Sequence, residues 1–143
     1  MLKKLIFLIS LLTLAFIFAA RQAEAESASP TDVYRHYLNR IYYAKNLKAV
    51  APYFVERTRQ YYEGLEGQAM LEELKKLKRS YVYKFVPTKE EKVGDMYYIL
   101  GNGIAMDHGK RVNCEVRVEL VLETAGWKIR MHCWKGKMRM PKG

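Results

Sequence analysis

The stretch VNCEVRVELVLETAGWKIRMHCW, residues 112–134, decides the fold. Its first half alternates strictly, with one parity taken by apolar residues: Val112, Cys114, Val116, Val118, Leu120 and Leu122. A period of two predicts a strand with one buried face. Thr124-Ala125-Gly126 then turns the chain into a second alternating segment that ends at Trp134. We therefore predict a pair of antiparallel strands in this part of the chain.

The alternation in the second of these strands predicts which side chains face solvent. Trp127, Ile129, Met131 and Cys133 take the core parity. The opposite parity and the residues that follow give a basic and aromatic surface: Lys128, Arg130, His132, Trp134, Lys135 and Lys137. No acid follows Glu123. This surface is interpreted either as a partner contact, or as an edge strand whose lysines block pairing with other chains.

Two further strands precede this pair. Tyr81 to Phe85 alternates and ends at Pro87, and a second strand is predicted from Met96 to Met106. Polar turns at 88–95 and 107–110 separate the strands. Gly101 and Gly103 mark a bulge or bend in the second strand.

The region before residue 80 has helical spacing instead. Ser29-Pro30-Thr31-Asp32 combines an N-cap, a first-turn proline and a capping acid, and it predicts a helix over about 30–44. A short helix capped by Asn46 is expected next. A third helical region covers about 56–79, divided at Gly64 and Gly67.

Helices followed by strands indicate an α+β fold, with N-terminal helices packed on one face of a curved, four-stranded antiparallel meander. We predict a single domain over 26–135 and a basic C-terminal tail over 136–143.

Residues 1–25 have the pattern of a cleavable signal peptide. Lys3 and Lys4 precede an apolar run over 5–20, and Ala23 and Ala25 suit the two small-residue subsites of a signal peptidase. An uncleaved membrane anchor is the alternative, although the run is shorter than the roughly 20 residues of a spanning helix. Loss of Lys3, Lys4, Arg21 and Glu24 lowers the formal charge from +10 to about +8. The protein is therefore predicted to be periplasmic or secreted, with a charge that favours anionic partners.

The chain resembles the nuclear transport factor two-like superfamily, also called ketosteroid isomerase-like, as a small exported bacterial member. The resemblance is carried by four segments: 29–33, 45–50 with Phe54, Gly94-Asp95, and 118–123 turning into 126–129. It implies a cone-shaped α+β fold, in which a curved sheet wraps the first helix around a conical pocket. Members include enzymes, ligand binders, secretion-machinery subunits and dimerising scaffolds, so the resemblance implies no activity. The tyrosine and two acids of the isomerases have no counterparts that can be placed here, and no catalytic residue is carried over.

Cys114 and Cys133 are the two cysteines of the chain. Both take the apolar parity of neighbouring strands, and an oxidising compartment would favour a disulfide between them. Two buried free thiols are the alternative. The spacing contains no CxxC motif, which speaks against a catalytic thiol.

Tyrosine is abundant, with 11 residues, and forms the doublets Tyr42-Tyr43, Tyr61-Tyr62 and Tyr97-Tyr98. Core and interface packing is the plain explanation. The functional alternative is a tyrosine-lined pocket or a sugar-stacking platform, for which the candidates are Tyr34, Tyr37, Tyr53, Tyr83 and Tyr98. The three histidines, His36, His108 and His132, lack metal-ligand spacing and are interpreted as surface residues.

The sequence thus predicts an exported, non-enzymatic binding or assembly module of the periplasm or cell envelope, whose basic surface contacts an anionic or protein partner. The alternative is a pocket within the cone that binds, or acts on, a small hydrophobic molecule. Homodimerisation through the sheet is a third interpretation. We expect no nucleic acid, cofactor or metal, and membrane contact only if the signal stays uncleaved.

Overall fold

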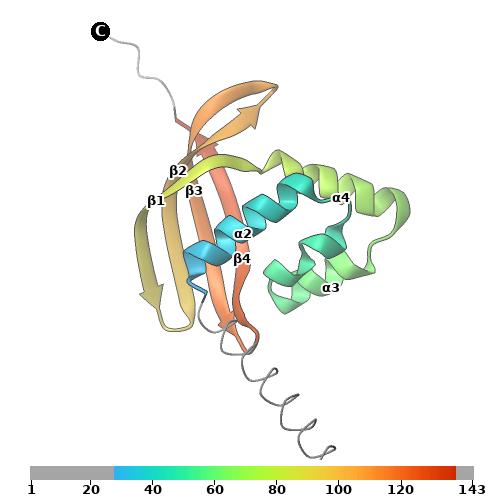
Figure 1. Cartoon of the computed structure of the whole chain (residues 1–143), viewed down its shortest axis with the longest axis horizontal. Coiled ribbons are helices and arrows are strands. Elements are labelled where there is room, and N and C mark those ends of the chain that lie inside the picture. Colours follow the sequence, from blue (N-terminus) through green and yellow to red (C-terminus); the bar gives the residue numbers. More distant parts are fainter. Residues whose placement is uncertain (1–27, 138–143) are drawn as a thin grey trace, which may run out of the picture.

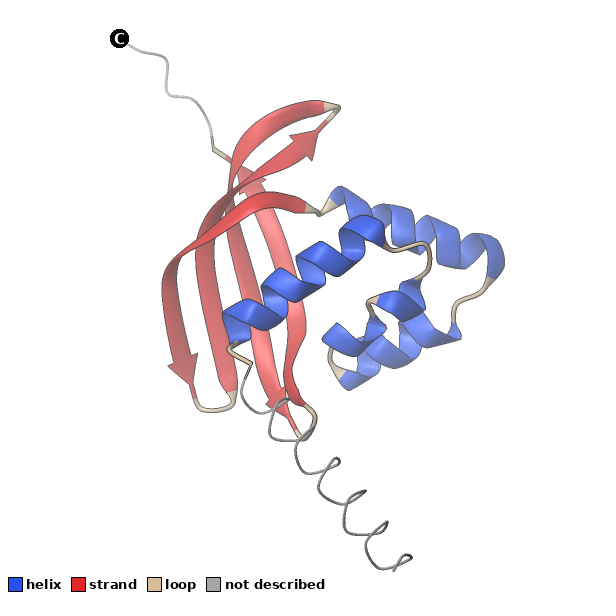
Figure 2. Cartoon of the chain, viewed as in Figure 1, coloured by secondary structure: helices blue, strands red, loops and turns tan. Residues whose placement is uncertain are grey.

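The computed structural model describes residues 28–137, so the predicted signal peptide and the last residues of the tail lie outside the described part. It contains the helices α2 (Pro30–Tyr43), α3 (Glu56–Gly64) and α4 (Gly67–Arg79), then the strands β1 (Val82–Val93), β2 (Met96–Asp107), β3 (Lys110–Glu123) and β4 (Gly126–Gly136). The strands form one antiparallel sheet in the order β1-β2-β3-β4. The helices lie on one side of the sheet, and α2 crosses it (Figures 1 and 2). The predicted α+β fold with a four-stranded meander is confirmed.

Helix α2 begins where its capping residues predict. The Ser29 hydroxyl accepts a hydrogen bond from the Asp32 backbone N–H at 3.1 Å, and Pro30 occupies the first turn. The residues that face the sheet recur at three- and four-residue spacing, and Tyr34, Tyr37 and Ile41 are fully buried. Burial of this face against the strands anchors α2 over the middle of the molecule.

The short helix predicted after Asn46 is two 3₁₀ turns, η1 (Leu47–Ala49) and η2 (Ala51–Tyr53). Asn46 caps the first turn by accepting from the Ala49 N–H at 3.1 Å. Pro52 has no N–H to donate and so prevents a regular α-helix. The segment ends at Phe54, which forms a parallel bridge with Ile129 and joins the helical layer to β4.

Strand β4 contains a bulge that the sequence does not reveal. Glu119 pairs with Met131, whereas Leu120 pairs with Ile129, so Arg130 is an extra residue on β4. An extra residue reverses the alternation for the rest of the strand. His132 and Trp134 therefore face the helices, and Cys133 is exposed on the other face. The prediction that His132 and Trp134 are outward-facing surface residues is wrong for this reason.

Strand β1 continues beyond Pro87, where the sequence predicted its end. Proline is tolerated because β1 is an edge strand, and a register shift between Pro87 and Lys89 accommodates the missing N–H. A second shift lies between Tyr83 and Val86, where Lys84 adopts a left-handed backbone conformation with φ of 50°. This bulge leaves Tyr83 on the outer side of the strand, while Phe85 packs against Tyr34 on the inner side.

The core fills the space between α2 and the inner face of the sheet. Its largest fully buried side chains are Tyr34, Tyr37, Ile41, Leu47, Ile99, Leu120 and Ile129. Aromatic contacts join α2 to the strands and to the segment before α3. Tyr34 meets Phe85 edge-on at 4.9 Å, and Tyr37 meets Phe54 at 5.2 Å. The interior of this fold is therefore packed side chains rather than open volume.

Candidate functional site

A shallow groove of about 370 Å³ lies between α3, α4 and β4. Its lining residues are Phe54, Thr58, Tyr62, Glu73, Lys76, Leu77, Ser80, Arg130, Met131 and His132. The bulge at Arg130 creates this arrangement, because it turns the imidazole of His132 toward the helices. The groove is the place where ionisable side chains from distant parts of the chain meet.

His132 is held by two hydroxyl groups. Its Nε2 atom lies 3.3 Å from the Tyr37 hydroxyl oxygen and 3.5 Å from Ser80 Oγ. Ser80 donates its proton to the Leu77 carbonyl oxygen at 2.7 Å, so we assign Tyr37 as the donor to Nε2. Burial lowers the pKa of His132 to about 4, because the charged imidazolium loses its hydration in this aromatic surrounding. The imidazole is neutral at pH 7.

This geometry does not form an acyl-transfer centre. A serine nucleophile must give its proton to the base, whereas the Ser80 proton is committed to Leu77. A catalytic histidine is also oriented by an acid. Within residues 28–137, the hydrogen-bond partners of His132 are Tyr37 and Ser80, and neither is a carboxylate. Glu73, at the rim of the groove, pairs with Lys76 at 3.3 Å instead.

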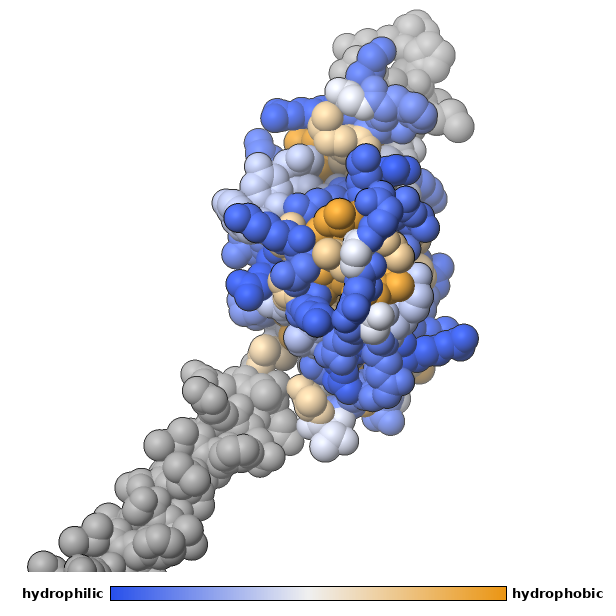
Figure 3. All heavy atoms as spheres, turned by 90° about the vertical axis from the view of Figure 1, so that its right-hand side faces the viewer, coloured by the Kyte–Doolittle hydropathy of each residue, from blue (hydrophilic) through white to orange (hydrophobic). Residues whose placement is uncertain are grey.

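A larger groove of about 700 Å³ runs along the exposed side of α4. Four cations, Lys75, Lys76, Lys78 and Arg79, line it together with the single acid Glu72 and the neutral residues Gln68, Leu71 and Leu74. The cations gather in the last turns of α4, where they also interact favourably with the helix dipole. Figure 3 looks onto the helical end of the molecule and shows a mostly hydrophilic surface around a small apolar area.

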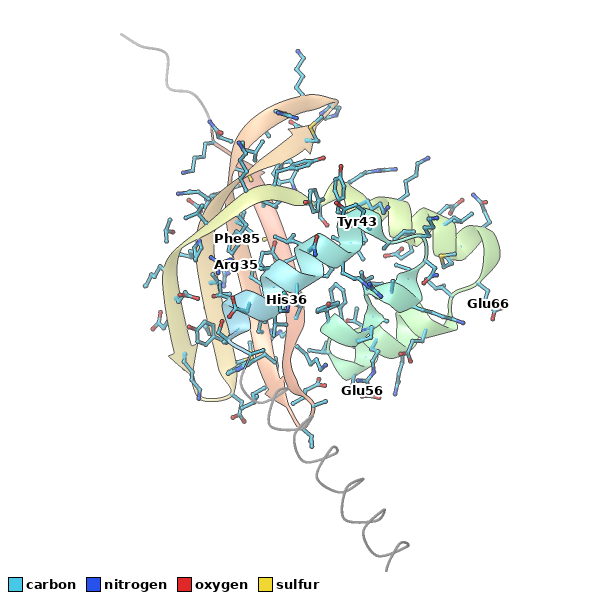
Figure 4. All side chains as sticks on the ribbon, viewed as in Figure 1. Arg35, His36, Tyr43, Glu56, Glu66 and Phe85 are labelled. Carbon is cyan, nitrogen blue, oxygen red and sulfur yellow. The ribbon has the colours of Figure 1, made fainter. Side chains whose placement is uncertain are left out.

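Beside this groove, four tyrosines form a contiguous surface, the tyrosine cluster (Tyr42, Tyr43, Tyr81 and Tyr83). Tyr42 lies 4.8 Å from Tyr43 and 5.4 Å from Tyr81, and Tyr81 lies 4.6 Å from Tyr83, measured between ring centroids. Burial, and then the neighbouring phenols, raise the pKa of Tyr81. Figure 4 labels Tyr43 at the end of α2, beside the start of β1. The sequence singled out the doublet at 42–43, but the convergence with residues 81 and 83 depends on how α2 meets β1.

The five tyrosines proposed as pocket residues are dispersed. Tyr34 and Tyr37 are fully buried, and Tyr53 is half-buried beside Tyr37 at 6.1 Å between rings. Tyr83 belongs to the tyrosine cluster. Tyr98 lies opposite Glu91 and Glu119 on the neighbouring strands, on the outer face of the sheet. The structure thus brings three of the five together, in the core.

The predicted basic surface on β4 is divided in the same way. His132 and Trp134 face the helices, whereas the cations lie outside and each has its own partner. Lys128 donates to the Pro52 carbonyl oxygen at 2.7 Å, Arg130 lies 3.7 Å from Glu119, Lys135 lies 3.2 Å from Glu115, and Lys137 donates to Asn102 at 2.6 Å. Arg130 and Lys135 meet carboxylates, whereas Lys128 and Lys137 donate to neutral oxygens. Along α4, Lys76 pairs with Glu73, and the other three cations of the groove form no ion pair with the described residues.

The two cysteines are not bonded to each other. Cys114 is buried on the inner face of the sheet, and Cys133 is exposed on the outer face, because the bulge at Arg130 reverses the parity of β4. The predicted disulfide is therefore not formed, since the two side chains point to opposite sides of the sheet. Burial raises the pKa of the Cys114 thiol.

Thiol labelling is expected to separate the two cysteines. In the folded protein a maleimide should modify Cys133 alone, because Cys114 is inaccessible and burial disfavours its thiolate. Denaturation without reductant should make both thiols reactive. Cys133→Ser should abolish labelling of the folded chain, and Cys114→Ser should leave it unchanged. Unreactive thiols in the denatured, unreduced chain would show a disulfide and contradict the structure.

The other two histidines are remote from the grooves described above. His36 is exposed on α2 (Figure 4), and His108 is exposed in the turn between β2 and β3, 2.7 Å from Asp107. Within residues 28–137, no three side chains of His, Cys, Asp or Glu are placed to hold a metal ion.

No family model, no curated protein sequence and no solved structure matches this chain. Within the described part of the chain, no helix combines the length and the apolar character needed to span a bilayer. A proposal for the function of this chain therefore rests on the geometry of the grooves and of the tyrosine cluster.

Proposed function

We propose that this chain is an exported, non-enzymatic binding or assembly module of the periplasm or cell envelope, which uses a basic surface to contact an anionic or protein partner. On this proposal the sheet and α2 form the cone of the nuclear transport factor two-like superfamily. The cone serves as a rigid scaffold for that surface and not as a reaction chamber.

The observation that carries the proposal is the packing of the interior. Tyr34, Tyr37 and Ile41 occupy the space between α2 and the sheet with no exposed area. Enzymes and small-molecule binders of compact folds usually keep a concave, largely preformed pocket. A filled interior supports recognition at the outer surface instead.

Charge supports the same conclusion. The chain carries 25 Lys and Arg residues against 15 Asp and Glu residues, a formal charge of +10. This excess is not spread evenly, since the groove along α4 has four cations and one acid. Such a surface raises the local concentration of anionic partners and speeds their association.

Cell fractionation tests this proposal. The full chain, expressed in a Gram-negative host, is expected in the envelope fraction, with a mass that shows cleavage after Ala25. High salt should release it and a mild detergent without salt should not, because screening weakens contacts between exposed charges. An intact chain in the cytoplasm, or a processed chain that never associates with the envelope, would overturn the proposal.

The groove at His132 favours a second candidate, which is binding of a small molecule. Phe54 and Leu77 supply apolar walls, while His132 and Ser80 supply polar groups that can orient a ligand. Ligand-induced changes in the NMR signals of His132, without product formation, would favour this candidate.

A further inference from the structure

We propose that the tyrosine cluster, together with the groove along α4, binds an acidic polysaccharide. This inference deepens the proposed function by naming the chemical class of the partner. The tyrosines stack on sugar rings, and the cations of the groove pair with carboxylate or other acidic groups along the glycan chain.

The cluster is accessible in a way that core aromatics are not. Tyr42 is 51 % exposed and Tyr43 is 72 % exposed, and these values are high for large aromatic side chains. Contiguous exposed aromatic surface marks interaction sites in soluble proteins. The rings of Tyr42 and Tyr43 are nearly perpendicular, at 83°, so two ring faces of different orientation are available to a ligand.

The groove and the cluster form one continuous surface. Lys78 lines the groove, and its Nζ atom lies 3.4 Å from the carbonyl oxygen of Tyr42. Arg79 also lines the groove and is two residues before Tyr81. A chain of linked sugars that followed α4 would therefore pass from the cations directly onto the tyrosine rings.

The surroundings of the cluster contain no acid in the sequence segments that build it. Residues 33–55 and 74–89 include no Asp or Glu, although they include Lys45, Lys78, Arg79 and Lys84. All four of these cations are exposed. An anionic ligand would therefore meet attraction along the cluster, and in the adjoining groove four cations outnumber the single lining acid, Glu72.

The backbone at Lys84 gives an independent sign of a functional constraint. Lys84 holds a φ of 50° at the bulge after Tyr83, a conformation that costs free energy for any residue except glycine. The bulge keeps Tyr83 turned outward within 6.4 Å of Tyr42. Bulges that redirect a side chain in this manner recur beside binding sites.

The chemistry of tyrosine favours a sugar over a lipid or a peptide. The negative face of the phenol ring attracts the C–H groups on the flat side of a pyranose, and the hydroxyl group exchanges hydrogen bonds with sugar hydroxyls. The cluster itself consists of phenol rings, and the exposed aliphatic side chain that the groove adds, Leu71, gives little area for insertion into a bilayer. None of its four rings lines either groove described above, so the cluster offers exposed ring surfaces and not a pocket for a peptide side chain.

The test compares three anionic probes with the purified, processed protein: alginate as a polyuronate, polyglutamate as an anionic polymer without sugar, and vesicles of phosphatidylcholine with phosphatidylglycerol. Dextran serves as the neutral glycan. We expect alginate to bind most tightly. The double variant Tyr42→Ala/Tyr43→Ala should weaken alginate binding about tenfold, which corresponds to about 1.4 kcal/mol. Its weak binding to polyglutamate should not change, because that contact depends on charge alone.

Two variants make the result specific. Tyr61→Ala removes a tyrosine of similar exposure, 54 %, on α3 and outside the cluster, and it should bind alginate like the wild type. Tyr42→Phe/Tyr43→Phe keeps the rings and should retain most of the affinity. Arg79→Gln should weaken alginate and polyglutamate alike, whereas Lys89→Gln, farther along β1, should affect neither.

Equal binding of alginate and polyglutamate, an unaffected double alanine variant, or a preference for the vesicles would each overturn the inference. These outcomes differ from a failure of the proposed function, which would show itself as a wild-type chain that is not exported or not retained in the envelope. A chain that is retained there but whose tyrosine variants bind alginate normally would refute the glycan site alone.

Discussion

Acidification from pH 7 to below pH 4 is expected to destabilise the folded chain by about 3 kcal/mol through His132 alone. The pKa of this imidazole falls from 6.5 to about 4 on folding, because burial among Tyr37, Phe54 and Ser80 strips the charged form of water. The unfolded chain therefore binds a proton more strongly than the folded chain. The contribution to stability is fully present above pH 6.5, declines between pH 6.5 and about 4, and is lost below that range.

Urea unfolding at several pH values measures this contribution. His132→Phe replaces the imidazole with a ring that needs no proton and should flatten the pH dependence between pH 7 and pH 5, where few carboxylates titrate. His36→Gln, at an exposed position on α2, should keep the wild-type pH dependence. If the phenylalanine variant does not fold, an NMR titration of the His132 imidazole in the wild type still tests the prediction. A titration midpoint near 6.5 would contradict its burial.

The sequence predicts most elements of this fold well, because they have strong local signals; β1 is an exception, since it continues past Pro87 to Val93. Ser29 and Pro30 mark the start of α2, Gly64 and Gly67 divide the later helices, and strict alternation marks β3. These signals come from residues that are neighbours in the chain. The order of helices and strands is then sufficient to predict the α+β class.

The sequence does not predict the orientation of side chains after the bulge in β4. Arg130 looks like an ordinary outward residue, and only the pairing with β3 shows that it is an extra one. From that position onward every inferred face is reversed, which affects Met131, His132, Cys133 and Trp134 together. A bulge is fixed by the register of two strands, and register is a long-range property that alternation within one strand does not encode.

The tyrosine cluster is a second feature that depends on contacts between residues far apart in the sequence. The doublet Tyr42-Tyr43 is visible in the sequence, as is the alternation of Tyr81 with Tyr83. Their proximity requires that the end of α2 lies next to the start of β1. In the sequence, 37 residues lie between Tyr43 and Tyr81. Candidate binding sites that span two such segments need the tertiary structure.

Gly103→Val is expected to destabilise the sheet strongly. Gly103 lies on β2 where β1 passes closest to it, and a Cβ atom there would collide with the side chain of Val82 and lie 3.1 Å from the Tyr83 carbonyl oxygen. Overpacking of this kind costs about 1–3 kcal/mol, and each kcal/mol lowers the Tm of a domain of this size by roughly 4–8 °C. Thermal unfolding followed by circular dichroism measures the effect.

Two control experiments distinguish this collision from a general destabilisation caused by replacing any glycine in the sheet. Gly136→Ala, in β4, adds a methyl group that meets no atom within 4 Å, and it should change stability by less than about 0.5 kcal/mol. In a double-mutant cycle with Gly103→Ala, Val82→Ala removes the colliding methyl groups, so the two substitutions together should cost less than the sum of their separate effects. Strict additivity would mean that β1 does not pass over Gly103 at this distance. It would also remove the packing constraint that places Tyr81 and Tyr83, on either side of Val82, beside the end of α2.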